Sequence, residues 1–150
     1  MSGSEQSASK WLEYRVEVFP HHTDYAGVVW HGSYVGWMEE ARVLALRSAG
    51  LGYEELVASG FELPVVELAV RYHQFAHMGD RIVIKHRVAG VEGVRIPWEY
   101  EIGSADGGRR FASARATLVL VDRQTGKIRR RRPPILEDAI AQLLAPVPEI

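Results

Sequence analysis

From residue 61 to residue 122 the sequence reads as a series of β-strands, and no other feature limits the fold as strongly. In three of the segments apolar and polar residues alternate, as they do in strands that bury one face. Between Arg81 and Val88 the even-numbered residues are apolar apart from His86, and most odd-numbered ones are arginine or lysine. Glycine-containing turns separate the segments, so neighbouring strands should pair as antiparallel hairpins. The expected strands cover residues 61–74, 80–91, 95–103 and 109–122, after a first strand near residues 14–18.

One long helix is expected ahead of these strands. Apolar or small residues recur at helical spacing from Ser33 to Ser48, and Gly50 ends the pattern. Further apolar residues, including Val35 and Leu44, widen the stripe over most of the circumference. A helix that is apolar on so many sides should be enclosed by other structure.

Small side chains in the last long strand favour the same arrangement. Ala112, Ala114 and Ala116 would share one face of the strand, which predicts that another element packs closely there. The expected fold is therefore α+β, with an antiparallel sheet wrapped around the long central helix. A weaker amphipathic pattern over residues 136–144 predicts a short helix at the end of the chain.

The composition fits one globular domain and excludes several classes of protein. The 150 residues are 47% hydrophobic, so we expect one domain over residues 11–150, preceded by a disordered tail over residues 1–10. The formal net charge of -1 gives no support for a nucleic-acid partner. The sequence has no cysteine, no apolar signal segment and no run of about 18 apolar residues. We therefore expect a cytoplasmic protein without a membrane span.

The stretch DYAGVVWHGSY, residues 24–34, places one acid a few residues before the expected helix. The first turn of a helix offers unpaired N–H groups and a partial positive charge, which can hold an oxygen that becomes negative during a reaction. Asp24 could then attack a carbonyl carbon or activate a water, with His31 and Gly32 as donors. The alternative is that Asp24 caps the helix or braces its loop. Spacing alone does not decide between these two roles.

Two sequence blocks resemble a known family. Residues 22–42, HTDYAGVVWHGSYVGWMEEAR, resemble the signature of the 4-hydroxybenzoyl-CoA thioesterase family, which includes the acyl-CoA thioesterases associated with the Tol-Pal system. Residues 65–84, VVELAVRYHQFAHMGDRIVI, are similar to a strand of that family. The blocks follow the family's order and cover much of residues 12–122. The resemblance implies a hotdog fold, in which a sheet wraps around the central helix.

The resemblance also assigns roles to residues of the first block. The second acid of the signature is catalytic in the family and matches Asp24. The backbone N–H that polarises the thioester carbonyl matches that of His31. The implied active site lies between subunits of a homodimer or a homotetramer. The expected acyl pocket is lined by Gly27, Val29, Trp30 and Tyr34.

The implied substrate is an acyl-CoA thioester, and the reaction needs no cofactor. Coenzyme A carries phosphates, so cations are expected at the rim of the site. Arg95, Arg129 and Arg131 are the candidates for phosphate binding. We expect no metal site, because the histidines form no HxH or HExxH motif and no cluster of acids accompanies them.

Departures from the signature keep other functions open. His22 replaces the first acid, and Pro20 stands where some members have a tyrosine. Phe75 takes the place of a proline in the second block, a change expected to be structural. A hotdog module that binds acyl-CoA without hydrolysing it is one alternative. A hotdog hydratase or dehydratase is another, although the sequence shows no acid and histidine motif for that chemistry.

Overall fold

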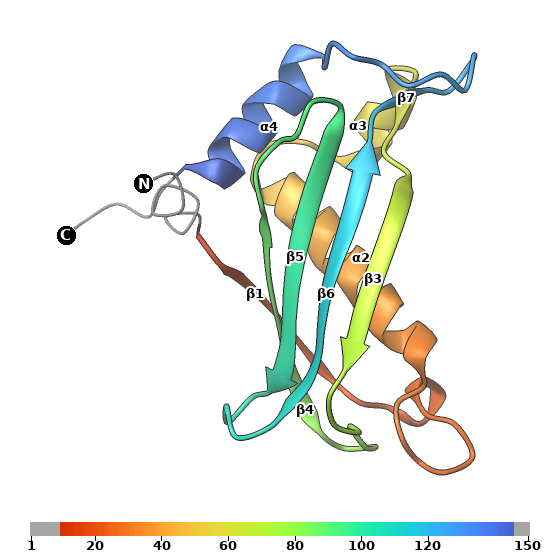
Figure 1. The fold of residues 1–150 in the computed structure, drawn as a ribbon, viewed down its shortest axis with the longest axis vertical. Helices are drawn as coiled ribbons and strands as arrows, with labels where there is room; N and C mark the ends of the chain where they lie inside the picture. Colours follow the sequence, from red (N-terminus) through yellow and green to blue (C-terminus); the bar gives the residue numbers. More distant parts are fainter. Residues whose placement is uncertain (1–9, 146–150) are drawn as a thin grey trace, which may run out of the picture.

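The computed structural model describes residues 10–145, which form a curved sheet with one long helix against it (Figure 1). Most of the tail expected over residues 1–10 and the last five residues of the expected domain lie outside the described residues. The strands are β1 (Leu12–Glu17), β2 (Phe61–Glu62), β3 (Val65–Tyr72), β4 (Arg81–Val88), β5 (Arg95–Ser104), β6 (Arg110–Val119) and β7 (Val121–Asp122). The helices are η1 (Pro20–His22), a 3-10 turn, and α2 (His31–Ser48), α3 (Tyr53–Ala58) and α4 (Pro134–Leu144).

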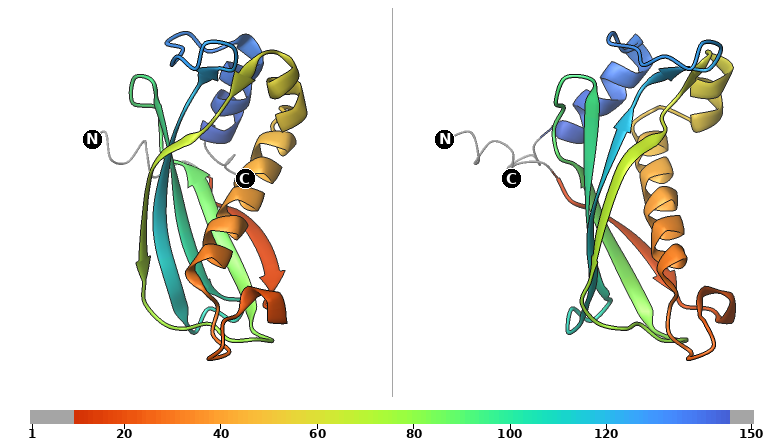
Figure 2. Two further views of the ribbon diagram at one scale, coloured as in Figure 1. Left: turned by 90° about the vertical axis from the view of Figure 1, so that its right-hand side faces the viewer. Right: turned by 45° about the vertical axis from the view of Figure 1, so that its right-hand side comes forward.

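Five strands make the main sheet, in the order β1-β4-β5-β6-β3, with every neighbouring pair antiparallel. The two views of Figure 2 show that the sheet curves and that α2 lies along its concave face. The expected α+β hotdog arrangement is therefore confirmed. Within residues 10–145, no helix has both the length and the hydrophobicity needed to cross a bilayer.

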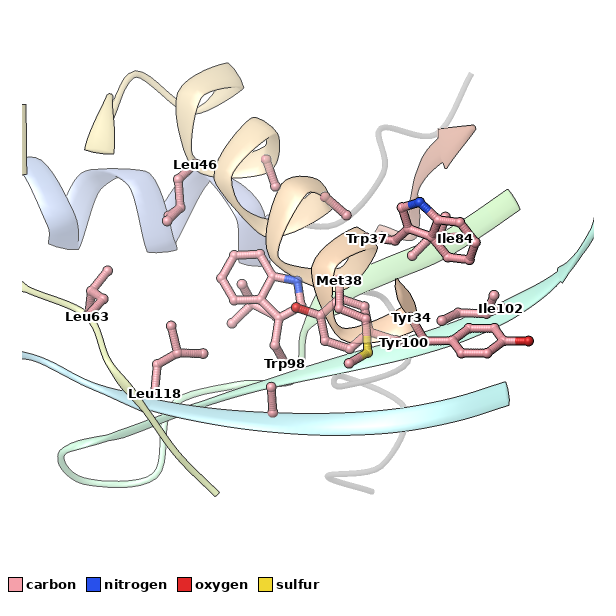
Figure 3. Packing of buried hydrophobic residues seen from close by; sticks show 14 of the residues in the cluster. Tyr34, Trp37, Met38, Leu46, Leu63, Ile84, Trp98, Tyr100, Ile102 and Leu118 are labelled. Carbon is pink, nitrogen blue, oxygen red and sulfur yellow. The ribbon is translucent and has the colours of Figure 1, made fainter. Parts of the chain in front are cut away.

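The alanine row of β6 lies opposite large residues of β5. Ala114 pairs with Tyr100 and Ala116 pairs with Trp98, so each of these small residues of β6 lies beside a large aromatic residue of β5. Trp98 and Tyr100 are almost completely buried and lie between the sheet and α2 (Figure 3). The two aromatic rings occupy the space beside the small alanine side chains, and α2 covers the rings.

The helix α2 buries only one face, which corrects the expectation that it is enclosed. Val35 and Leu44 remain 37% and 42% exposed. A single curved sheet can cover one side of a helix, so the widened apolar stripe is left open on the other. On the covered side Arg42 is buried, and its Nη1 donates a hydrogen bond to the Tyr100 hydroxyl over 3.0 Å.

Two of the expected strands are each divided in two. The segment 61–74 breaks at Leu63 and Pro64, where β2 ends and β3 begins, because a proline offers no N–H for a ladder. The segment 109–122 breaks at Leu120, so that β7 leaves the main sheet and pairs with β2. The other elements that the sequence predicted agree with expectation to within a few residues, and the helix predicted near the end of the chain is α4.

Candidate active site

Asp24 lies in a tight loop that joins η1 to the start of α2. The loop is closed by an antiparallel bridge between Thr23 and Val29 and by a hydrogen bond from the Asp24 N–H to the Val28 carbonyl over 2.9 Å. Gly27 takes a positive φ of 77° at the tip, a conformation that glycine adopts without strain. The sequence therefore folds back on itself here and holds Asp24 at a fixed point ahead of the helix.

The two carboxylate oxygens of Asp24 have different surroundings. Oδ1 accepts hydrogen bonds from the N–H groups of Ala26, over 2.9 Å, and Val28, over 3.4 Å. Within residues 10–145 no side chain or N–H donates to Oδ2. One oxygen thus braces the loop, as the alternative reading of the sequence expected, and the other is available to a substrate or a water.

The first turn of α2 presents N–H groups at the same site. Trp30 precedes the helix in an extended conformation, and its side chain provides no cap. The Ser33 N–H bonds to the Trp30 carbonyl over 3.0 Å, whereas the N–H groups of His31 and Gly32 find no backbone acceptor in the described part of the chain. These two donors, at the positive end of an 18-residue helix, can stabilise a negative oxygen.

A cavity of about 500 Å³ joins the acid to the helix end. This volume lies in the range of pockets that hold small organic ligands, about 300–1,000 Å³. Its lining is largely aromatic, with Asp24 as its one acid and neither a lysine nor an arginine. The lining residues are Asp24, Val28, Val29, Trp30, His31, Tyr34, Tyr72, His73, Gln74 and Phe75.

Tyrosines form the inner wall of the cavity. The rings of Tyr34 and Tyr72 meet edge to face, with centroids 5.4 Å apart. The Tyr72 hydroxyl donates a long hydrogen bond of 3.5 Å to the His31 carbonyl, which links β3 to the first turn of α2. Burial raises the pKa of both phenols, so both remain neutral donors near neutral pH.

Comparison with known proteins places this geometry in a family. The sequence model of the thioesterase-like superfamily matches residues 18–144. The chain belongs to this superfamily. A putative esterase of Synechocystis, sll0410, is 44% identical over 139 residues, which are 93% of this chain and 84% of that protein. The acyl-CoA thioester hydrolase YbgC of Escherichia coli is 30% identical over 91 residues, 61% of this chain and 68% of that protein.

Solved structures agree with the fold of this thioesterase-like protein. The crystal structure of Slr0204, a 1,4-dihydroxy-2-naphthoyl-CoA thioesterase from Synechocystis, superposes with a TM-score of 0.82 at 27% identity. It covers 91% of this chain and all of that one. The hotdog thioesterase fold expected from the sequence blocks is thus confirmed, at the level of the superfamily.

Most residues expected to form the site of this thioesterase-like chain do meet at one cavity. Asp24, His31, Val29, Trp30 and Tyr34 all line it. The remaining member, Gly27, stands at the loop tip and shapes the loop without lining the cavity.

Four lining residues come from the end of β3 and the segment after it, and sequence reasoning did not assign them to the site. They are Tyr72, His73, Gln74 and Phe75. Phe75 was expected to be structural, yet its exposed ring forms part of the cavity wall. The second sequence block contained these residues. A bridge between Val28 and His77 and a hydrogen bond from the Val29 N–H to the Ala76 carbonyl, over 2.8 Å, hold the segment after β3 beside the start of α2.

The three arginines proposed for phosphate binding lie at the other end of the fold. Arg95 begins β5 and forms an ion pair with Glu67 of β3. The Arg129 guanidinium lies 3.5 Å from Asp122 and over the ring of Phe61, and Arg131 is exposed in the same loop. Figure 1 shows this loop near β7, at the opposite end of the sheet from the Asp24 loop.

Proposed function

We propose that the protein hydrolyses an acyl-CoA thioester to a free acid and coenzyme A. The observation that carries the proposal is the meeting, at one cavity, of the Asp24 carboxylate and the first N–H groups of α2. Membership of the thioesterase-like superfamily supports the reaction class. The names of the relatives, an esterase and an acyl-CoA thioester hydrolase, support it further.

The chemistry follows from the two groups. The thioester carbonyl oxygen would bind at the N–H groups of His31 and Gly32, which lower the energy of the oxyanion. One such donor is typically worth about 3–4 kcal/mol in the transition state. Asp24 would act on the carbonyl carbon from the other side, through Oδ2, to which no group of residues 10–145 donates. The aromatic wall would exclude bulk water and hold the acyl group.

Two routes are compatible with this arrangement. In the first, an Asp24 oxygen attacks the carbonyl carbon and coenzyme A leaves as the thiol; water then attacks the Asp24 carbonyl carbon of the mixed anhydride, which releases the acid and restores the carboxylate. In the second, Asp24 takes a proton from a water that attacks the carbon directly. A single turnover in ¹⁸O-labelled water separates them, because only the first route leaves the label in the Asp24 carboxylate.

We propose further that the protein acts as a homodimer formed through β3, with a dimer of dimers as the larger possibility. This strand is one edge of the main sheet, and it exposes apolar side chains, with Val66 and Leu68 at 48% and 43%. Exposed apolar edge strands are prone to pair with a second strand. Antiparallel pairing of two β3 strands would extend the sheet across both subunits.

Such a dimer would supply the cations that the cavity lacks. Antiparallel pairing brings the Val65 end of one β3 beside the Tyr72 end of the other. The first of these ends carries Arg95, through its ion pair with Glu67, and the loop of Arg129 and Arg131 lies beyond it. We therefore propose that these arginines bind the phosphates of a coenzyme A whose acyl group occupies the partner's cavity.

Within the superfamily we favour the branch of the 4-hydroxybenzoyl-CoA thioesterases, and a flat or aromatic acyl group as the substrate. The sequence blocks and the aromatic lining of the cavity support this finer assignment. We keep a cytoplasmic location, which the absence of cysteine supports, as part of the same proposal.

A panel of acyl-CoA thioesters tests the proposal. The panel contains benzoyl-, 4-hydroxybenzoyl- and 1,4-dihydroxy-2-naphthoyl-CoA beside short and long aliphatic ones, and release of the free thiol is followed. We expect hydrolysis above the background of the Asp24→Asn variant, with the aromatic thioesters preferred. Binding of these thioesters without any thiol release would favour a non-catalytic module instead. Formation of an enoyl product from a hydroxyacyl-CoA would favour a hydratase.

A further inference from the structure

The ring of His22 holds the 3-10 turn that precedes the Asp24 loop. Its Nδ1 accepts a hydrogen bond from the Phe19 N–H over 2.9 Å. The ring also contacts Trp37 of α2, with centroids 4.9 Å apart. The hydrogen bond from Phe19 to His22 is one half of a capping box, in which the side chain of the third residue of a helix accepts a hydrogen bond from the N–H of the N-cap residue.

The backbone of the same residue is attached to the start of α2. The His22 carbonyl accepts hydrogen bonds from the Trp30 N–H, over 3.1 Å, and from the Ser33 hydroxyl, over 3.0 Å. Asp24 follows only two residues later in the chain. His22 therefore fixes the 3-10 turn and the Asp24 loop relative to the first turn of α2, where the proposed oxyanion site lies.

We propose that His22 is a positioning residue that holds Asp24 opposite the first turn of α2 only while its ring is neutral. This inference rests on the proposed function of Asp24. A ring nitrogen accepts a hydrogen bond only when it carries no proton, so the proton of the neutral ring must lie on Nε2. Protonation of Nδ1 would set two N–H groups against each other and loosen the turn.

The groups around His22 favour the neutral ring. Partial burial is the largest cause that lowers the pKa of His22, and the neighbouring His21 of the same turn lowers it further. From α2, Glu40 acts in the opposite direction, and its Oε1 is itself bound by the Tyr14 hydroxyl of β1 over 2.7 Å. The turn is therefore intact at neutral pH and is lost as the pH falls below the ordinary histidine range.

Two substitutions of His22 test its hydrogen-bond acceptor and its ring contact with Trp37 separately. Asparagine carries Oδ1 at the same number of bonds from Cα as histidine Nδ1, and it does not titrate, so His22→Asn retains the acceptor. His22→Phe retains a ring against Trp37 but loses the acceptor. His21→Gln changes the pKa of His22 in the opposite way: it leaves the bond to Phe19 in place but removes a neighbouring ring that lowers the His22 pKa, so it should keep kcat at pH 7.5 and move the acidic limb to higher pH.

The pH profile of kcat is the first readout. We expect His22→Asn to keep kcat within about threefold at pH 7.5 and to move the acidic limb to lower pH, whereas KM changes little. His22→Phe should lower kcat by about 10- to 100-fold at all pH values, as expected for a misplaced catalytic group. An acidic limb that is the same in the parent and in His22→Asn would overturn the proposal.

Nitrogen NMR of the histidine rings gives a second readout that does not depend on activity. The His22 signals, assigned by their absence in His22→Asn, should show an unprotonated Nδ1 and a protonated Nε2 at pH 7.5. A protonated Nδ1 at that pH would overturn the proposal even if His22→Phe does not fold. An Asp24→Asn variant that is as active as the parent would instead overturn the proposed function and leave the ring assignment intact.

Discussion

The indole of Trp30 lies directly over Gly32, at the start of α2. A Cβ added to Gly32 would stand 2.1 Å from the indole carbon Cη2, much closer than any real contact. The indole can keep this position only while residue 32 is a glycine. Trp30 lines the cavity, so the Gly32 position sets where this part of the cavity wall stands, next to the proposed oxyanion site.

Replacing Gly32 with alanine should displace the indole and damage the acyl pocket. We expect kcat/KM for the best acyl-CoA to fall by about tenfold, because the acyl group loses one wall. Gly36→Ala is the matched control, since it lies in the same helix with nothing within 4 Å of an added Cβ. The control should raise the free energy of unfolding by about 0.5–1 kcal/mol and leave kcat/KM unchanged. Equal activities of the two variants would contradict this role of Gly32.

His86 should make the protein less stable in acid. Burial lowers its pKa from 6.5 to about 4, and no group bonds to its Nδ1 in the described chain. The unfolded chain therefore binds this proton more readily, so stability is lost as the pH falls from about 6.5 to about 4. The difference corresponds to about 3 kcal/mol.

Urea unfolding of His86→Phe at pH 7 and pH 4 measures this loss. The variant should lose less unfolding free energy than the parent over this interval, by up to about 3 kcal/mol. An equal loss in the parent and in His86→Phe would show that another group causes the acid sensitivity.

Dimer formation through β3 should be sensitive to charge at its exposed edge. Leu68→Lys would place like charges near each other where two β3 strands meet, so we expect a monomer by light scattering. Leu44→Lys is the control, because Leu44 is equally exposed but lies on α2. If Leu44→Lys dissociates the protein and Leu68→Lys does not, the subunits contact each other through the helix.

Arg95 should affect only substrates that carry the nucleotide of coenzyme A. We expect Arg95→Ala to raise KM for an acyl-CoA by about 5- to 10-fold, because it removes a charge-assisted contact with a phosphate. KM for the corresponding acyl-N-acetylcysteamine, which has no phosphate, should not change. Arg15→Ala, on the opposite edge strand β1, is the control. An equal rise in KM for both substrates would place Arg95 outside the phosphate site.

The elements of the fold could be predicted because they depend on local patterns. The alternation in Arg81–Val88 and the glycines that follow α2 are local signals, and both led to elements with nearly correct bounds. The break at Pro64 was missed, because the segment remains apolar on both sides of the proline. The exposure of Leu44 was missed as well, since a sequence pattern cannot tell how many layers cover a helix.

The site was predictable only where its residues are close in sequence. Asp24 and His31 are seven residues apart, and the family signature contains both. Tyr72 reaches the same cavity through the pairing of β3 with β6, and Phe75 reaches it through the bridge between Val28 and His77, and no local spacing encodes either contact. The acceptor role of His22 depends on the geometry of a 3-10 turn, so the sequence alone could only record it as a departure from the signature.

The kcat/KM of Asp24→Asn for the best acyl-CoA of the panel tests the central claim most directly. The amide has nearly the same shape as the carboxylate but can neither attack a thioester nor take a proton from water. Asp138→Asn, at an exposed acid of α4, controls for the loss of one charge. We predict that Asp24→Asn lowers kcat/KM by about 10³-fold or more, with an unchanged melting temperature, and that Asp138→Asn has no effect. An Asp24→Asn protein that retains activity within about tenfold of the parent would contradict the account.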